Sequence, residues 1–250
     1  MARGIISRYG RFAKRRAMTT RALGVVGVLL TSVILLTYYG MRVGNFVITV
    51  SGRYVTGLAL TVDEEKLDEK SRLIADPLPE ALDADYSYIP ADIENGIGSK
   101  NDNNENRYFA YSFYLLNTGN VSVSYTMTYD LLRVSKSLDS IIRIMIIKDG
   151  VRTVYAKASE QPDRLGEPEK VYTASGYLFD TVPFNIDQSN TIIKQNYYDL
   201  QVGQSSKFTI VMWMDGWDAE QTNDMKGGQL QTKVTFKVLY ENQQLENNSN

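Results

Sequence analysis

Hydrophobic and polar residues alternate in two stretches of the chain, residues 121–131 and 229–238. In the first, valine, tyrosine, methionine and leucine occupy the odd positions, with serine, threonine and aspartate between them. In the second, mainly apolar residues occupy the even positions, with glutamine, lysine and threonine between them. A period of two places one face of a β-strand in a core and the other in water. Both stretches therefore predict strands of antiparallel sheets with a single buried face.

Other segments are apolar on both faces and predict central strands. Tyr108–Asn117 reads YFAYSFYLLN, and residues 141–147 form a second dense run. Asp149-Gly150 separates that run from residues 151–157, and this dipeptide between β-rich segments predicts a hairpin. Two further predicted strands cover residues 45–51 and 207–214.

Helical signals are few. Residues 63–75 predict a short helix that ends at Asp76-Pro77. The sequence of residues 187–198 is compatible both with a helical turn and with a loop. Residues 159–169 contain two prolines and a glycine, which predicts a surface loop. Many short strands with few helices predict an all-β fold, a two-sheet antiparallel sandwich of jelly-roll or immunoglobulin-like type.

An uncharged, strongly apolar segment, residues 23–39, lies near the N-terminus. Seven basic residues and no acid precede it. As a helix it is long enough to cross a hydrocarbon core at about 1.5 Å per residue, and the basic flank predicts a cytoplasmic N-terminus. A cleaved secretory signal is the main alternative, although a small-residue cleavage pattern is missing. A helix buried in a globular core is the third reading.

The sequence therefore predicts four regions. They are a basic cytoplasmic tail at 1–21, a transmembrane signal-anchor helix at 22–40, an extracellular β-sandwich domain at 41–241, and a disordered polar tail at 242–250. This order predicts a single-pass protein of the plasma membrane whose C-terminal domain lies outside the cell.

Charge and composition narrow the function classes. The whole chain has a formal charge of -2, so without the seven basic tail residues the remainder carries -9. Such an acidic domain repels phosphates and is a poor partner for nucleic acid. The chain has no cysteine and no histidine. Disulfides, Ser-His-Asp and Cys-His sites and histidine-based zinc sites are excluded, while chemistry by paired carboxylates or a lysine base is not.

Three stretches resemble a known family. Leu200-Gln-Val-Gly203, then residues 207–218 (KFTIVMWMDGWD), then Gly227-Gly228 before a final alternating strand, resemble the ending of TasA/camelysin-like surface proteins of Gram-positive bacteria. YFAYSFYLLNTGN resembles the middle of small membrane-anchored members of that group. The resemblance implies a jelly-roll domain at the cell surface, in some relatives assembled into biofilm-matrix fibres. The metallopeptidase activity ascribed to some relatives is not carried over, because this chain has no zinc-binding motif.

Two sets of residues are candidate sites. An acidic loop offers the oxygen ligands that calcium prefers, although an ordinary strand connection is the more favoured reading; its residues are Asp215, Asp218, Glu220 and Asp224. Trp213 and Trp217 are candidates for stacking on a sugar ring, with core packing as the alternative. Phe46, Ile48 and Val50 belong to the first strand after the apolar segment, which either pairs within its own domain or joins the sheet edge of a neighbour.

These observations favour a non-enzymatic, membrane-anchored surface protein with a structural, adhesive or biofilm-matrix-associated role. The alternative is an extracellular glycan- or ligand-binding module, and a carboxylate-based hydrolase is the least favoured reading. No cofactor is predicted apart from the calcium candidate. The expected partners are the lipid bilayer, the protein itself or related subunits, and cell-wall glycan.

Overall fold

The computed structural model describes residues 31, 46–51, 57–75, 78, 80–99, 106–185 and 190–239. The chain divides into two compact units, residues 1–43 and 44–250. Within the described ranges, no helix has both the length and the apolar character needed to cross a membrane. The predicted basic tail, transmembrane helix and polar C-terminal tail lie outside the described residues, except for Thr31.

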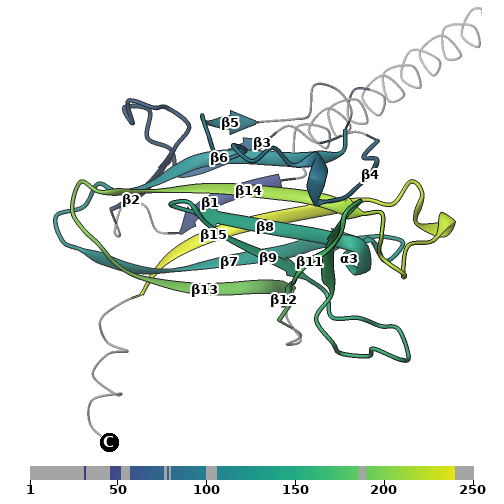
Figure 1. Ribbon diagram of the computed structural model, residues 1–250. Coiled ribbons are helices and arrows are strands. Elements are labelled where there is room, and N and C mark those ends of the chain that lie inside the picture. Colours follow the sequence, from purple (N-terminus) through teal and green to yellow (C-terminus); the bar gives the residue numbers. More distant parts are fainter. Residues whose placement is uncertain are drawn as a thin grey trace, which may run out of the picture. The chain divides into compact units, whose positions relative to one another are not determined.

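One sheet of the second unit has five strands in the order β13-β7-β15-β1-β3 (Figure 1). Its two alternating segments, β7 and β15, pair antiparallel along most of their lengths. The first strand of the unit, β1, lies between β15 and β3. The bounds are β1 Phe46–Ser51, β3 Arg72–Ala75, β7 Val123–Val134, β13 Thr191–Leu200 and β15 Leu230–Leu239.

The other large sheet has the order β12-β9-β8-β14-β6-β2, with β4 beside β14 and β5 beside β6. Its bounds are β2 Leu58–Thr61, β4 Asp83–Ala84, β5 Gly98–Ser99, β6 Tyr108–Asn117, β8 Ile142–Lys148, β9 Val151–Ala156, β12 Val182–Pro183 and β14 Ser205–Asp215. A separate hairpin joins β10 Lys170–Thr173 to β11 Gly176–Asp180. Three short helical turns complete the described elements: η1 Tyr86–Tyr88, α3 Leu138–Ile141 and η2 Asn223–Met225.

The chain is mainly β, as predicted, but both large sheets are mixed. β1 runs parallel to β15, β12 to β9, and β4 to β14. The expectation of purely antiparallel sheets is therefore wrong at these three pairings. A tight hairpin can join only antiparallel strands, whereas the members of these pairs are far apart in the sequence and are free to run parallel.

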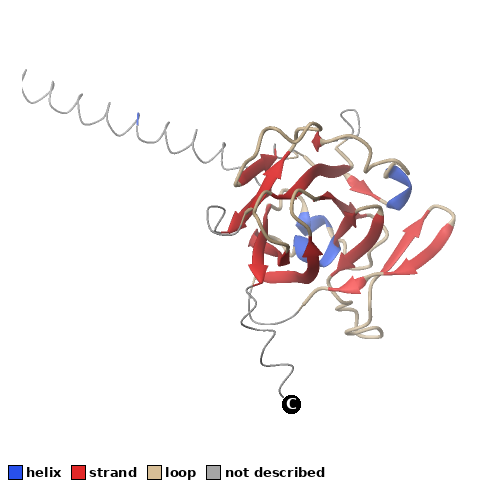
Figure 2. Cartoon of the chain, turned by 90° about the vertical axis from the view of Figure 1, so that its left-hand side faces the viewer, coloured by secondary structure: helices blue, strands red, loops and turns tan. Residues whose placement is uncertain are grey.

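Side chains from both large sheets share one hydrophobic core, and Figure 2 shows the strands arranged around that interior. The alternating positions supply it as predicted: Tyr125, Met127 and Tyr129 from β7 and Val234 and Phe236 from β15 are all at most 1% exposed. The polar positions between them face away from this core. Period-two alternation in these strands is thus confirmed.

A second hydrophobic cluster explains why β6 and β8 are apolar on both faces. Tyr108, Met145 and Trp213 pack on the outer face of the second sheet, away from the shared core. Residues 84–93 and Val171 and Phe179 of the β10–β11 hairpin cover that face. The sheet is buried on both sides, which requires apolar residues at successive positions.

The predicted helix at residues 63–75 is wrong. Asp63 accepts hydrogen bonds from the backbone N–H groups of Glu65 and Leu67 and thereby holds a turn. The segment then enters β3, whose Leu73 and Ala75 are buried and which pairs antiparallel with β1. Pairing with β1 thus overrides the local helical preference. For residues 187–198 the sequence left two alternatives, a helical turn and a loop. The described residues of this segment belong mainly to strand β13 instead.

A buried arginine–carboxylate cluster as the candidate functional site

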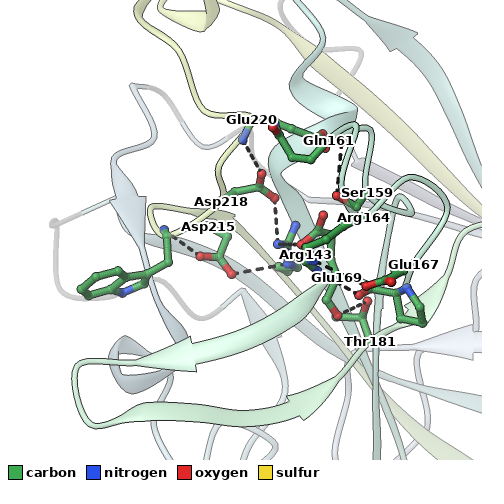
Figure 3. Close-up of polar contacts among 12 residues, drawn as sticks. Arg143, Ser159, Gln161, Arg164, Glu167, Glu169, Thr181, Asp215, Asp218 and Glu220 are labelled. Carbon is green, nitrogen blue, oxygen red and sulfur yellow. Dashed lines mark hydrogen bonds and ion pairs between the residues drawn. The ribbon is translucent and has the colours of Figure 1, made fainter.

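Arg143 lies in β8, opposite Trp213 of β14, and is only 1% exposed. Its Nη2 atom donates a hydrogen bond of 2.8 Å to Asp218 Oδ2. Its Nε atom lies 3.4 Å from Asp215 Oδ2, an ion pair that lacks hydrogen-bond geometry. Glu169 Oε2 is 3.8 Å from Nη2. Three carboxylates thus surround one guanidinium under the loops at this end of the sheet (Figure 3).

Two aspartates shape the loop that follows β14. Asp215 Oδ1 accepts a hydrogen bond from the backbone N–H of Trp217, and Asp218 Oδ1 accepts one from the backbone N–H of Glu220. An aspartate that binds the N–H two residues ahead forms a local turn. Each carboxylate therefore uses one oxygen to fold the loop and the other to face Arg143 (Figure 3).

The other wall is the predicted surface loop at residues 159–169. Ser159 closes it, because its N–H donates to Glu167 O and its carbonyl accepts from Gly166 N–H. Arg164 of this loop lies 3.5 Å from Glu169 Oε2. The backbone carbonyl of Glu169 accepts hydrogen bonds from Thr181 N–H and Oγ1. Glu169 is therefore held between two arginines at the inner edge of the loop.

Burial sets the protonation behaviour of the cluster. It raises the pKa of Asp215 to about 6, against the opposing effects of Arg143 and the Trp217 N–H; the charges of Asp218 and Asp85 raise the pKa further. The pKa of Glu220 is also raised, mainly by burial. A carboxyl with a pKa near 6 has the property of a general acid, but buried ion-pair networks shift pKa values in the same way. Asp215 is 1% exposed, and a substrate does not reach it in this arrangement.

The structure brings together only part of the predicted calcium set. Carboxylate oxygens of Asp218, Glu220 and Glu169 lie within 4.8 Å of one another, and Glu220 Oε2 has no hydrogen-bond partner. Asp215 instead faces Arg143, and Asp224 lies in η2. Hard oxygen ligands at this spacing suit a cation, yet Arg143 and Arg164 already bring positive charge to Asp218 and Glu169. The calcium site stays a prediction.

The two tryptophans have different environments. Trp213 is 2% exposed and packs in the second hydrophobic cluster. It is therefore a core residue, which was the alternative to sugar stacking. Trp217 is 60% exposed, and its indole N–H donates to Asp85 Oδ2 at 3.2 Å. Trp217 also lines a pocket of about 160 Å³ together with Arg143, Glu169 and Tyr172. Only Trp217 is thus placed to contact a ligand.

The three assembly candidates face the shared core. Phe46, Ile48 and Val50 are at most 7% exposed, and the ring centroids of Phe46 and Phe109 lie 4.9 Å apart. β1 pairs within its own domain, in register with β15 over six residues and with β3 over four. These side chains are therefore core residues while β1 keeps this position.

Sequence reasoning missed Arg143, Arg164 and Glu169. Arg143 stands alone within the apolar run of residues 141–147, and a charged residue in a strand that is apolar on both faces requires a buried partner. That signal identifies Arg143. Its partners lie on two distant loops, and no local pattern marks them.

Comparisons with known proteins add no family. No model of a known protein family matches the chain, and no curated protein matches it. Among solved structures, a β-glucosidase from Kluyveromyces marxianus aligns at 11% identity with a TM-score of 0.25. The alignment covers 76% of this chain and 17% of that enzyme. Similarity at this level supports no conclusion about fold or activity.

Proposed function

We propose that the chain is a non-enzymatic, single-pass membrane protein that displays a jelly-roll-like or immunoglobulin-like β-sandwich on the outside of a Gram-positive cell. In this proposal residues 22–40 are the anchor, the N-terminus is cytoplasmic, and the domain has a structural, adhesive or matrix-associated role. The resemblance to TasA/camelysin-like proteins and the basic flank of the apolar segment support it.

The observation that carries the proposal is the position of β1. This strand begins seven residues after the apolar segment ends at Tyr39, and it is an interior strand with a partner on each side. Along the chain, β1 is the first strand after the anchor, so a pull on the anchor reaches the domain through β1. Because β1 is bonded to β15 and β3, its release requires both ladders to break together. Such a joint suits a domain that bears load at a membrane.

The acids around Arg143 also support a non-enzymatic role. Asp215 and Asp218 are buried and face Arg143, and each also holds a turn of its own loop. Carboxylates with these structural duties are poorly placed for glycoside cleavage, which needs two acids that flank a bound sugar.

N-terminal sequencing of the protein from cell fractions tests the anchor. We expect a chain that starts near Met1 in the membrane fraction.

The double variant Leu29→Arg/Leu30→Arg tests the same segment by placing two charges in it. Each charge costs about 2.5–3.5 kcal/mol at a helix centre, so this variant is expected to leave the membrane fraction. Leu132→Arg, at an exposed position of β7, is the matched control and is expected to stay. Intact wild-type chain in the cytosol contradicts the proposal, while a start near residue 40 in the medium shows a cleaved signal.

A second function, ligand binding at the Trp217 end, rests on one observation. The ring of Trp217 is exposed, yet its indole N–H is held by Asp85, so the ring is oriented before any ligand arrives. Sedimentation with purified cell wall tests this alternative. Loss of binding in Trp217→Ala supports it, and equal binding by the variant and the wild type contradicts it.

A further inference from the structure

A larger pocket lies at the opposite end of β8 and β14. It has a volume of about 390 Å³, and its walls come from β7, β13, the β8–β9 turn and the start of β14. Figure 1 shows the β13–β14 connection at the end of the sheets away from α3. Ligand pockets occupy about 300–1,000 Å³. This pocket reaches that range, whereas the pocket beside Trp217 does not.

Aromatic rings form much of its lining. Tyr125, Tyr197 and Tyr198 all border the pocket, and the ring centroids of Tyr125 and Tyr197 lie 5.3 Å apart. Burial, with the neighbouring Tyr155 and the charge of Asp149, raises the pKa of Tyr197 to about 12. Its hydroxyl is therefore neutral at physiological pH. The pocket combines flat apolar faces with hydroxyl groups that both donate and accept hydrogen bonds.

Tyr125 belongs to the buried part of the pocket lining. It is 1% exposed, and its hydroxyl is covered by protein atoms. Burial raises the pKa of Tyr125, and a hydrogen bond with Ser206 lowers it. A ligand therefore contacts the exposed part of the lining, above all Tyr198.

A bulge in β13 turns one tyrosine outward. Tyr197 is opposite Tyr125 and Leu200 is opposite Val123, so β13 holds one residue more than β7 across this interval. Within it, Asp199 adopts a left-handed backbone with φ of 60°. Bulges redirect side chains and are frequent beside functional sites. Tyr198, inside this bulge, is 68% exposed and stands at the pocket.

Two of the three charged residues that line the pocket, Lys148 and Asp149, pair with each other. Lys148 Nζ donates to Asp149 Oδ2 at 2.6 Å and lies 5.3 Å from the ring centroid of Tyr197. The other oxygen of Asp149 accepts from Lys207 N–H at 2.8 Å. The third charged residue, Asp199, accepts a hydrogen bond from Gln201 Nε2. The uncharged Gln204, Ser205 and Ser206 also belong to the polar lining. Such a lining favours an uncharged ligand rich in hydroxyl groups.

From these observations we infer that the pocket between β13 and β14 binds a neutral saccharide. The C–H face of a sugar ring packs on Tyr198, and a sugar hydroxyl forms a hydrogen bond with the exposed side-chain amide of Gln204. The inference goes beyond the proposed function and does not depend on the membrane anchor, so either one can fail without the other.

Calorimetric titration of the full chain tests the inference. The chain is kept in a zwitterionic detergent that contains no sugar, and it is titrated separately with cellotetraose, chitotetraose and maltotetraose. We expect at least one of the three to bind with a dissociation constant of about 1 mM or tighter. The absence of binding by all three overturns the inference.

Two variants place the binding at this pocket. Tyr198→Ala removes the exposed ring and is expected to weaken binding about tenfold. Gln204→Ala removes an exposed amide from the lining and is expected to weaken binding about fivefold. Tyr177→Ala is the matched control, because Tyr177 is 54% exposed on β11 and does not line the pocket; it is expected to bind as the wild type does. Wild-type affinity in both pocket variants overturns the inference.

Sedimentation of the protein provides a second readout, because the exposed Tyr198 could instead contact another copy of the chain. Self-association that is abolished by Tyr198→Ala and unchanged by saccharide would show such a contact and would also overturn the inference.

Discussion

Buried polar groups at the two ends of β8 and β14 differ in charge and in how they are paired. At one end, Arg143 is buried with Asp215, Asp218 and Glu169 around it. At the other end, the neutral hydroxyl of Tyr125 is buried beside Ser206, without good hydrogen-bond geometry. An unpaired buried charge is far more costly than an unpaired buried hydroxyl. Charged groups are therefore neutralised inside the fold, whereas a hydroxyl can be buried with a poorly aligned partner.

The difference also concerns how each end is covered. Loops 159–169 and 215–220 close over Arg143 and are fixed by their own hydrogen bonds. The β13–β14 end has a pocket with an exposed tyrosine at its border. The charged end therefore stabilises the fold, whereas the tyrosine end offers a surface for contact with a ligand. Three substitution experiments test this contrast, and the largest effect is expected at the charged end.

Replacing Arg143 with methionine is expected to destabilise the fold strongly. The change leaves three buried carboxylates without their central cation, and removal of one partner from a buried ion pair costs about 3–5 kcal/mol. The free energy of unfolding in urea, followed by the fluorescence of buried Trp213, measures it.

Arg152→Met is the matched control. Arg152 pairs with Glu94 at 2.9 Å, but the two side chains are 28% and 31% exposed, and such a pair is worth about 0–1 kcal/mol. Equal losses of unfolding free energy in the two variants would show that the Arg143 cluster does not stabilise the fold more than a surface ion pair does.

Most of the fold followed from local patterns, and the exceptions have a physical reason. Alternation in β7 and β15 and the double-faced apolar run of β6 are local properties, and they predicted strands correctly. The helix predicted at residues 63–75 failed because β3 gains more from pairing with β1 than the isolated segment gains as a helix. Parallel pairing of β1 with β15 joins segments from opposite ends of the second unit, and no local pattern encodes that choice.

The sites were less predictable than the strands, because each depends on contacts between distant segments. The acidic loop after β14 was identified, but the partners of Asp218 come from β8 and from the loop before β10. Tyr125 was predicted as a buried residue from its alternation. The state of its hydroxyl depends on Ser206 and β13, which lie many residues away.

Asp215→Asn tests the protonation of the charged end. The folded pKa of Asp215, about 6, lies above the usual value for aspartate, so the folded protein binds this proton more tightly than the unfolded chain. The contribution of Asp215 to stability is therefore full below pH 4 and falls as pH rises through 6. Relative to wild type, the asparagine variant is expected to gain about 2–3 kcal/mol between pH 4 and pH 7. Urea unfolding at several pH values measures the difference.

Asp85→Asn provides a control of opposite sign. Burial works against ionisation of Asp85, but hydrogen bonds from Ser87 and Trp217 outweigh it and lower its pKa. The stabilisation from ionised Asp85 is present above the unfolded pKa and disappears as pH falls through the folded pKa, so the wild type loses its advantage over this variant in acid. A pH-independent difference between wild type and Asp215→Asn would mean that Asp215 ionises as freely in the fold as outside it.

The smallest effect is expected at the tyrosine end, where two tyrosines of β7 form a matched pair. Tyr129 is fully buried, and its hydroxyl donates to Thr232 Oγ1 at 3.2 Å, so Tyr129→Phe is expected to lose about 1 kcal/mol of unfolding free energy. Tyr125→Phe removes a hydroxyl that has no well-aligned partner and is expected to change stability by less than about 0.5 kcal/mol, or to raise it. Urea unfolding of both variants measures the contrast. An equal loss in the two variants would show that the Tyr125 hydroxyl has as good a hydrogen-bond partner inside the fold as the Tyr129 hydroxyl has.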